Sequence, residues 1–194
     1  MRGRTALMLG LLMLGCGWFD TRSPAEPSES NVPWRQPTQA HYVVENLENT
    51  LEGMDLTLYG RCIDADRFLF QADPVLAQID PSRYENWRWA VEEGSTRRML
   101  EAVEQHWGTA DSAIVLAFTE EEWLVNEADT SMVQYRYHLT VHHGRTDVDS
   151  LAVGTLRWGF RRSAADRLWY LAGWSDFADE AGTAWSTIRG AFRQ

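Results

Sequence analysis

The chain has 194 residues, of which 44% are hydrophobic, enough for one folded domain with a core and additional segments. Its 28 acidic residues outnumber 18 basic residues, all of them arginine, and the formal net charge is −10 at pH 7. This balance argues against a nucleic-acid-binding protein and against attraction to anionic lipid surfaces, because both require a basic surface. Any membrane attachment must therefore be covalent or inserted.

The first residues have the pattern of a secretory signal. Arg2 and Arg4 form a positive start, residues 6–14 are mostly apolar, and the small residue Gly15 precedes Cys16. The apolar run is too short for a transmembrane helix, which needs about 20 residues. A charged start, a short apolar stretch and a small residue before the cut are typical of a cleaved secretory signal.

The Gly-Cys step at the end of this signal resembles the lipobox of bacterial lipoproteins, although Met13 and Leu14 differ from the residues that the family prefers there. In that family the cysteine receives a diacylglycerol and the leader is cut directly before it. The resemblance implies a signal peptide over residues 1–15 and a lipid anchor at Cys16. Two or more acyl chains give stable membrane attachment.

The resemblance also implies a location. In Gram-negative lipoproteins Asp after the cysteine favours the inner membrane, and this chain has Gly17. We therefore expect a protein of the cell envelope, on the outer membrane and facing the periplasm if the cell is Gram-negative. The competing interpretation is an ordinary secretory signal, in which case Cys16 is incidental and is free to form a disulfide with Cys62. With Cys16 lipidated, Cys62 is predicted to be a small buried residue.

Residues 16–37 are predicted to be a flexible spacer. Four prolines are joined by serine, glutamate and asparagine, and few residues could bury an apolar face. Such a segment would hold a domain away from the membrane. The folded domain is predicted over residues 38–194.

The domain is predicted to begin with two helices. Thr38 can cap the first, which Gly53 ends, and Asp55 can cap a shorter second helix that reaches Ile63. Apolar residues of the first helix recur at three- and four-residue steps and form one stripe. They are Ala40, Val43, Val44, Leu47, Leu51 and Met54.

A short strand is predicted at residues 66–70, followed by a loop at residues 73–79. Asp80-Pro81 favours a helix start, because the aspartate supplies a side-chain acceptor and proline presets the backbone angle. Gly94-Ser95 is predicted to break this helix, and a further helix is expected to run to Trp107.

From residue 113 onward the pattern predicts strands. Residues 113–118 and 123–125 are largely apolar, and residues 131–143 alternate without a fault, which is typical of a long strand with one apolar face. We expect residues 131–143 to be the central strand of a bent sheet covered by helices, with a hairpin connection at residues 143–147. The apolar face consists of Val133, Tyr135, Tyr137, Leu139 and Val141.

Two further strands and a helix complete the domain. The alternation in residues 151–162 changes phase at Gly154-Thr155, which predicts a β-bulge there. A last strand is expected at residues 168–174 and a terminal helix at residues 181–192.

This order of elements resembles the cone-shaped α+β fold of the NTF2-like, or SnoaL-like, superfamily and, more narrowly, poorly described bacterial lipoproteins of that fold. The resemblance covers about residues 38–190. It implies N-terminal helices packed on a curved antiparallel sheet with a pocket between them, and frequent homodimers. Superfamily members include steroid isomerases, dehydratases, polyketide cyclases and binding or scaffold domains. The matching segments are Val44-Glu45-Asn46-Leu47, Asp55 to Tyr59, Asp66 to Phe70, Trp174-Ser175-Asp176 and Trp185.

Two interpretations of the pocket remain open. If the polar face of residues 131–143 lines it, His138 with Asp66 or Asp176 could form an acid–base pair for proton abstraction next to a carbonyl. In the alternative, that face contacts solvent and the tyrosine-rich face is core. Candidates for lining a pocket that holds a small apolar ligand are Tyr59, Trp87, Tyr135, Arg136, Trp158 and Trp174.

No motif indicates a metal, a cofactor or a nucleophile. His138 and His142 would lie about 13 Å apart along a strand, too far to share one ion, and the chain has no HExxH motif, G-x-S-x-G elbow or phosphate loop. The sequence therefore favours a non-enzymatic, lipid-anchored envelope protein that binds a small apolar ligand or a partner protein. The alternative is an envelope enzyme of the isomerase or dehydratase type.

Overall fold

The computed structural model describes residues 31–108, 112–179 and 183–193. The predicted signal peptide, Cys16 and the spacer up to residue 30 lie outside these ranges, as does the expected start of the terminal helix at residues 181–182. Among the described residues, no helix combines the length and the apolar character needed to cross a membrane.

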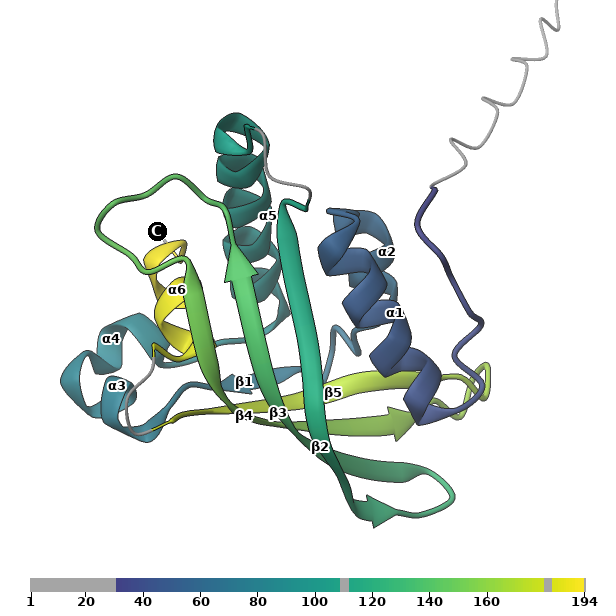
Figure 1. The fold of residues 1–194 in the computed structure, drawn as a ribbon. Coiled ribbons are helices and arrows are strands. Elements are labelled where there is room, and N and C mark those ends of the chain that lie inside the picture. Colours follow the sequence, from purple (N-terminus) through teal and green to yellow (C-terminus); the bar gives the residue numbers. More distant parts are fainter. Residues whose placement is uncertain (1–30, 109–111, 180–182, 194) are drawn as a thin grey trace, which may run out of the picture.

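One curved sheet of five strands forms the base of the domain (Figure 1). The strand order is β1-β5-β4-β3-β2; β1 runs parallel to β5 and the other pairs are antiparallel. The central strand is therefore β4, and the strand predicted to be central, β3, lies one position nearer the edge. The bounds are β1 Leu69–Gln71, β2 Ile114–Asn126, β3 Thr130–Val141, β4 Leu151–Arg162 and β5 Trp169–Ala178.

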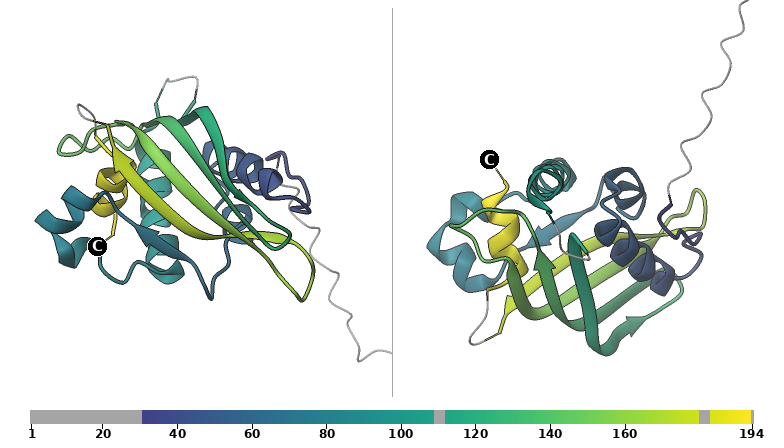
Figure 2. Two further views of the ribbon diagram at one scale, coloured as in Figure 1. Left: turned by 90° about the horizontal axis from the view of Figure 1, so that it is seen from below. Right: turned by 45° about the horizontal axis from the view of Figure 1, so that its top comes forward.

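The long helices α1 and α5 lie over the same, concave face of the sheet, and α6 lies beside α5 (Figures 1 and 2). The opposite, outer face of the sheet has no helix over it (Figure 2, left). The helices within the described ranges are α1 Ala40–Glu52, α2 Leu56–Arg61, α3 Pro74–Ile79, α4 Pro81–Tyr84, α5 Trp89–His106 and α6 Trp185–Ala191.

The first two helices confirm the predicted stripe and one of the two predicted caps. Val43 and Leu47 of α1 are fully buried. The carboxylate of Asp55 accepts a hydrogen bond from the backbone N–H of Leu58 at 2.9 Å and begins α2 as expected. Thr38 does not cap α1: the residue before the helix is Gln39, which makes no side-chain capping hydrogen bond.

Residues 73–79, predicted to be a loop, form helix α3. The carboxylate of Asp73 accepts hydrogen bonds from the backbone N–H groups of Val75 (2.9 Å) and Leu76 (3.2 Å), and Pro74 occupies the first turn. The Asp-Pro signal that was recognised at residues 80–81 thus occurs twice in succession, and both copies begin a helix.

The predicted helix break at Gly94-Ser95 is wrong, because α5 continues through both residues. The Ser95 hydroxyl is buried and donates to the backbone carbonyl of Arg189 at 2.9 Å, so it does not compete with the helix backbone. The break lies earlier, after α4, where Asn86 has a positive φ of 54°.

Strand β3 alternates as predicted, with its apolar residues buried in the core and His138 exposed on the other face.

In β4 the predicted bulge at Gly154 is wrong, because Ala152, Gly154 and Leu156 all face inward in regular register with β3. A β-carbon on Gly154 would lie 2.3 Å from the carbonyl oxygen of Phe177, so this glycine permits close packing. The apparent change of phase arose from outward-facing apolar residues such as Leu151, which is 52% exposed.

The register irregularities lie elsewhere. Two occur between β2 and β3, at residues 119–122 and 123–125, and one occurs between β4 and β5 at Gly159/Phe160. Strand β5 extends beyond the predicted residue 174 to Ala178, and α6 is shorter than the predicted terminal helix. The irregularities increase the local twist and curve the sheet around the core.

Candidate functional site

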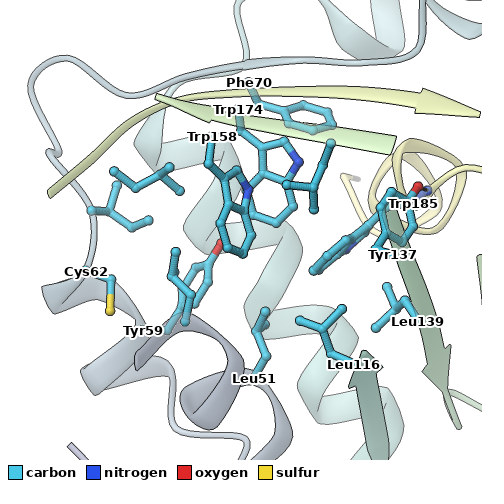
Figure 3. Packing of buried hydrophobic residues seen from close by; sticks show 14 of the residues in the cluster. Leu51, Tyr59, Cys62, Phe70, Leu116, Tyr137, Leu139, Trp158, Trp174 and Trp185 are labelled. Carbon is cyan, nitrogen blue, oxygen red and sulfur yellow. Dashed lines mark hydrogen bonds between the residues drawn. The ribbon is translucent and has the colours of Figure 1, made fainter. Parts of the chain in front are cut away.

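Aromatic side chains fill the space between the concave face of the sheet and the helices (Figure 3). The rings of Trp158 and Trp174 meet edge-to-face at 5.1 Å, and those of Trp174 and Trp185 at 4.6 Å. Tyr137 packs on Trp185 at 5.5 Å. All four side chains are at most 1% exposed. Edge-to-face packing of this kind adds to the stabilisation from buried area.

Most of the predicted pocket residues lie in this core. They point inward but contact one another, so the protein's own side chains occupy the region in which a ligand was expected. Arg136 does not belong to this group, because it lies on the outer face of the sheet and pairs with Asp179 at 2.5 Å. The buried members are Tyr59, Trp87, Tyr135, Trp158 and Trp174.

A buried ion pair joins α5 to α6 inside this aromatic core. Glu92 is fully buried, Arg189 is 4% exposed, and the Nη1 of Arg189 donates to Oε2 of Glu92. Three neutral groups also donate to the same carboxylate: the Tyr59 hydroxyl (2.6 Å), Trp87 Nε1 (2.9 Å) and the Thr96 hydroxyl (3.0 Å). Donors therefore surround both oxygens of the carboxylate, as a buried charge requires.

The surroundings of Arg189 keep it charged. Burial alone would lower the pKa of Arg189, but the negative charge of Glu92 beside it holds the pKa above its usual range. Burial, together with Glu92, raises the pKa of the Tyr59 hydroxyl, which stays a neutral donor. The guanidinium also lies over the ring of Trp174, 3.8 Å from its centroid, a favourable cation–π arrangement.

A second buried network surrounds Asp176 at the end of β5. The Tyr137 hydroxyl donates to Oδ1 at 2.8 Å, and the backbone N–H and hydroxyl of Ser186 donate to Oδ2 at 2.6 and 2.5 Å. Burial raises the pKa of Asp176, and the hydrogen bonds from Ser186 and Tyr137 partly oppose that shift. The carboxylate is fully buried and has protein donors on both oxygens, an arrangement suited to fixing α6 on the sheet.

The structure does not assemble the predicted acid–base pair. His138 is exposed on the outer face of β3, whereas its neighbour Tyr137 points into the core and reaches Asp176. Asp66 is exposed in the turn before β1. His138 and Asp176 thus lie on opposite faces of the sheet, and the alternative interpretation of the polar face is the one that the structure shows.

Sequence reasoning missed Glu92 and Arg189. The two residues are 97 positions apart, and the pattern of either helix alone does not reveal the pair. A signal was nevertheless present, because Glu92 lies on the same stripe of α5 as Thr96, Met99 and Val103, all of them buried. An acid on the apolar stripe of a helix implies a buried partner.

Within the described ranges, no group of three or more histidine, cysteine, aspartate or glutamate side chains is arranged to hold a metal ion. Cys62 is buried, and burial raises the pKa of its thiol, so the reactive thiolate is disfavoured.

Replacing Asp176 by Asn should give a stability difference that depends on pH. Because the pKa of Asp176 is raised from 3.8 in the folded state, its stabilising contribution is complete below that value and is lost as the pH rises through the folded pKa. Lowering the pH from 7 to 4 should therefore favour the wild type over Asp176→Asn, because only the wild type has a carboxyl group that can be protonated. Urea unfolding of both proteins at several pH values measures this.

Asp166→Asn is the matched control. A hydrogen bond from Tyr170 lowers the pKa of this exposed carboxyl below its usual value, so the wild type should lose its advantage over this variant as the pH falls. Parallel pH profiles for the two variants would contradict the assignment for Asp176.

Comparison with known proteins shows a likeness of fold alone. No family model matches the chain, and no curated protein matches it. A putative aromatic ring hydroxylase from Novosphingobium aromaticivorans superimposes with a TM-score of 0.50 over 77% of this chain and 93% of its own, at 9% identity. An NTF2-like protein from Cytophaga hutchinsonii gives 0.49 over 72% and 95%, at 11% identity. A putative ketosteroid isomerase from Shewanella frigidimarina gives 0.46 over 70% and 92%, also at 11% identity.

At such low identity these similarities carry no information on activity. The architecture itself agrees with the expected class, since helices pack on the concave face of a curved, mostly antiparallel five-stranded sheet. The chain therefore has an α+β fold.

Proposed function

We propose that this chain is a lipid-anchored protein of the cell envelope that binds a partner protein through its surface and catalyses no reaction. The observation that carries this proposal is the filled interior. Trp158, Trp174 and Trp185 pack where an open cone would hold a ligand, and the Glu92–Arg189 pair is enclosed behind them. A binding function must then use the outside of the domain.

The catalytic alternative lacks support from the geometry. An envelope isomerase or dehydratase would need a base within reach of a substrate in the cone. His138 faces away from the cone, and both oxygens of the buried Asp176 carboxylate accept hydrogen bonds from protein groups.

The anchor rests on the leader sequence and on the spacer that follows it. Replacing Cys16 by Ser should abolish the increase in mass from acylation and release the protein from the membrane fraction. Intact-mass spectrometry and fractionation of cells that express the two forms measure this. Cys62→Ser is the control and should remain acylated; an unchanged acyl mass on Cys16→Ser would reject the anchor.

A second candidate function is uptake of a small, largely apolar ligand into the aromatic core. The indole N–H groups of Trp158, Trp174 and Trp185 are buried without a hydrogen-bond acceptor among the described residues. Buried donors of this kind call for an explanation, and a ligand with acceptor atoms would supply one. This candidate requires the intact protein to gain thermal stability from a small aromatic molecule that carries an acceptor, such as acetophenone with its carbonyl oxygen.

A further inference from the structure

We propose that a groove on the outer face of the sheet binds an extended, acidic segment of a partner protein. The groove has a volume of about 610 Å³ and lies across β1, β5, β4 and β3, on the face that no helix covers (Figure 2, left). This inference deepens the proposed function, on which it rests, by naming the surface and the chemistry of the partner.

The middle of the groove floor is a pair of glycines. Gly173 of β5 pairs with Gly159 of β4. In the same row across the sheet, Leu69 of β1 pairs with Gly173, and Met132 of β3 pairs with Gly159. Neighbouring strands are about 4.8 Å apart, so the row spans roughly 14 Å across the sheet. Its middle is half-buried backbone that no side chain covers.

Neither backbone strain nor crowding explains these two glycines. Neither has a positive φ. A β-carbon on Gly173 would have no atom within 4 Å, and one on Gly159 would have its nearest neighbour at 3.9 Å. The register irregularity beside Gly159 involves the backbone and does not require a bare surface at Gly173. Glycine weakens a strand interior and often marks a place where a ligand or another backbone approaches closely.

The charge around this floor is opposite to that of the whole chain. Four arginines line the groove and no acidic residue does, although the chain carries a net charge of −10. Within the described ranges only one of the four takes part in an ion pair, Arg67 with Asp64 at 3.1 Å. The other three are exposed: Arg88, Arg157 and Arg161.

The spacing of the arginines fits several carboxylates on one extended chain. Arg157 and Arg161 lie four residues apart on the outer face of β4, about 13 Å, with Gly159 between them. Acidic residues four apart on an extended segment have the same spacing. Arg88 lies beside β1, because the backbone N–H of Phe70 donates to the carbonyl of Trp87 at 3.0 Å. Guanidinium groups bind carboxylates through charge-assisted, often bidentate, hydrogen bonds.

Two other occupants fit less well. An anionic membrane is broad and would also meet the acidic remainder of the surface, whereas a single segment can enter the hollow alone. A symmetric second copy would place one arginine-lined groove on another, and the like charges would oppose that contact.

The test uses the full-length protein in detergent and a fluorescein-labelled octapeptide of alternating Glu and Thr. Fluorescence anisotropy should show binding to the wild type that weakens as salt is added. The double change Arg157→Gln and Arg161→Gln should weaken it about tenfold or more. Gly173→Val should weaken it similarly, because the side chain fills open space in the floor, and should leave the thermal unfolding temperature nearly unchanged.

The matched control removes two arginines elsewhere, Arg83→Gln with Arg97→Gln, both in exposed ion pairs on helices. This variant should bind the peptide like the wild type. Equal weakening by the control, or equal binding of a Gln-Thr peptide, would overturn the proposal. If the protein binds phosphatidylglycerol vesicles but not the peptide, the surface is assigned to a membrane instead. If it forms a dimer that dissociates in the Arg157/Arg161 variant, the surface is assigned to a second copy. Peptide binding does not depend on the acyl chain. An unchanged acyl mass on Cys16→Ser would therefore reject the anchor and leave the result of the peptide test unaffected, so the two proposals fail separately.

Discussion

Replacing Arg189 by Met is expected to lower the free energy of unfolding by about 3–5 kcal/mol, one of the two largest losses that we predict for a single substitution. The reason is the carboxylate left behind. Glu92 is fully buried between α5 and α6, and removal of the guanidinium leaves its charge without a counterion in the core. Urea or guanidinium unfolding followed by circular dichroism measures the loss.

A double-mutant cycle separates this effect from lost packing. Glu92→Gln removes the charge but keeps an oxygen that can accept a hydrogen bond from Tyr59 or Trp87. The loss of stability in the double variant with Arg189→Met should therefore be smaller than the sum of the losses in the two single variants. Additive losses would show that the pair is not coupled. The exposed pair of Arg97 with Glu93 on the same helix is the control, because Arg97→Met should cost no more than about 1 kcal/mol.

The parts of the fold that were predicted correctly are those that local chemistry determines. The first helix has an apolar stripe that needs no distant residue for its recognition, and the carboxylate of Asp55 caps its own helix. The alternation of β3 places Tyr135 and Tyr137 on one face whatever its neighbours are. The order of such elements was sufficient to predict the α+β class.

The errors occur where a local signal has two outcomes and the tertiary structure selects one. Gly94-Ser95 can break a helix, but a backbone carbonyl of α6 accepts a hydrogen bond from the Ser95 hydroxyl, and α5 continues. Gly154 can mark a bulge, but here it makes room for Phe177 and Tyr137. Strand order is equally non-local, and for this reason β3 was placed in the centre instead of β4.

The candidate site depended still more on long-range packing. The sequence indicates that His138 and Tyr137 face opposite ways, but it does not say which face is covered by helices. The helices cover the tyrosine face, which places Tyr137 on Asp176 and leaves His138 in solvent. The groove was likewise invisible in the sequence, because Gly159 and Gly173 become neighbours only through the pairing of β4 with β5.

Net charge also proved to be a coarse guide to binding. The excess of acidic residues argues against nucleic acid, yet it does not describe every part of the surface. The pairing of strands gathers arginines around one hollow that lacks acidic residues. A chain that is acidic as a whole can therefore offer a local site to an acidic partner, with the remaining surface opposing broad anionic surfaces.

Replacing Trp158 by Ala is expected to lower the free energy of unfolding by about 3–5 kcal/mol and to leave a cavity in the core. Trp158 is fully buried and contacts Phe118 (5.2 Å between ring centroids) and Trp174 (5.1 Å). Its indole N–H has no acceptor among the described residues, so the loss should come from packing alone and Trp158→Phe should cost less. Trp107→Ala, at a side chain that is 40% exposed, is the control and should cost less than either.

The cavity also decides between the two candidate functions. A space lined by Phe118 and Trp174 is apolar. An engineered apolar cavity of about 150 Å³ in a protein core stays dry and binds benzene, so small aromatic molecules should bind here. Acetophenone should therefore raise the unfolding temperature of Trp158→Ala and leave that of the wild type unchanged, because only the variant has room for it. If acetophenone also stabilises the wild type, the core opens to admit ligands, and uptake into the cone becomes the better account of this protein.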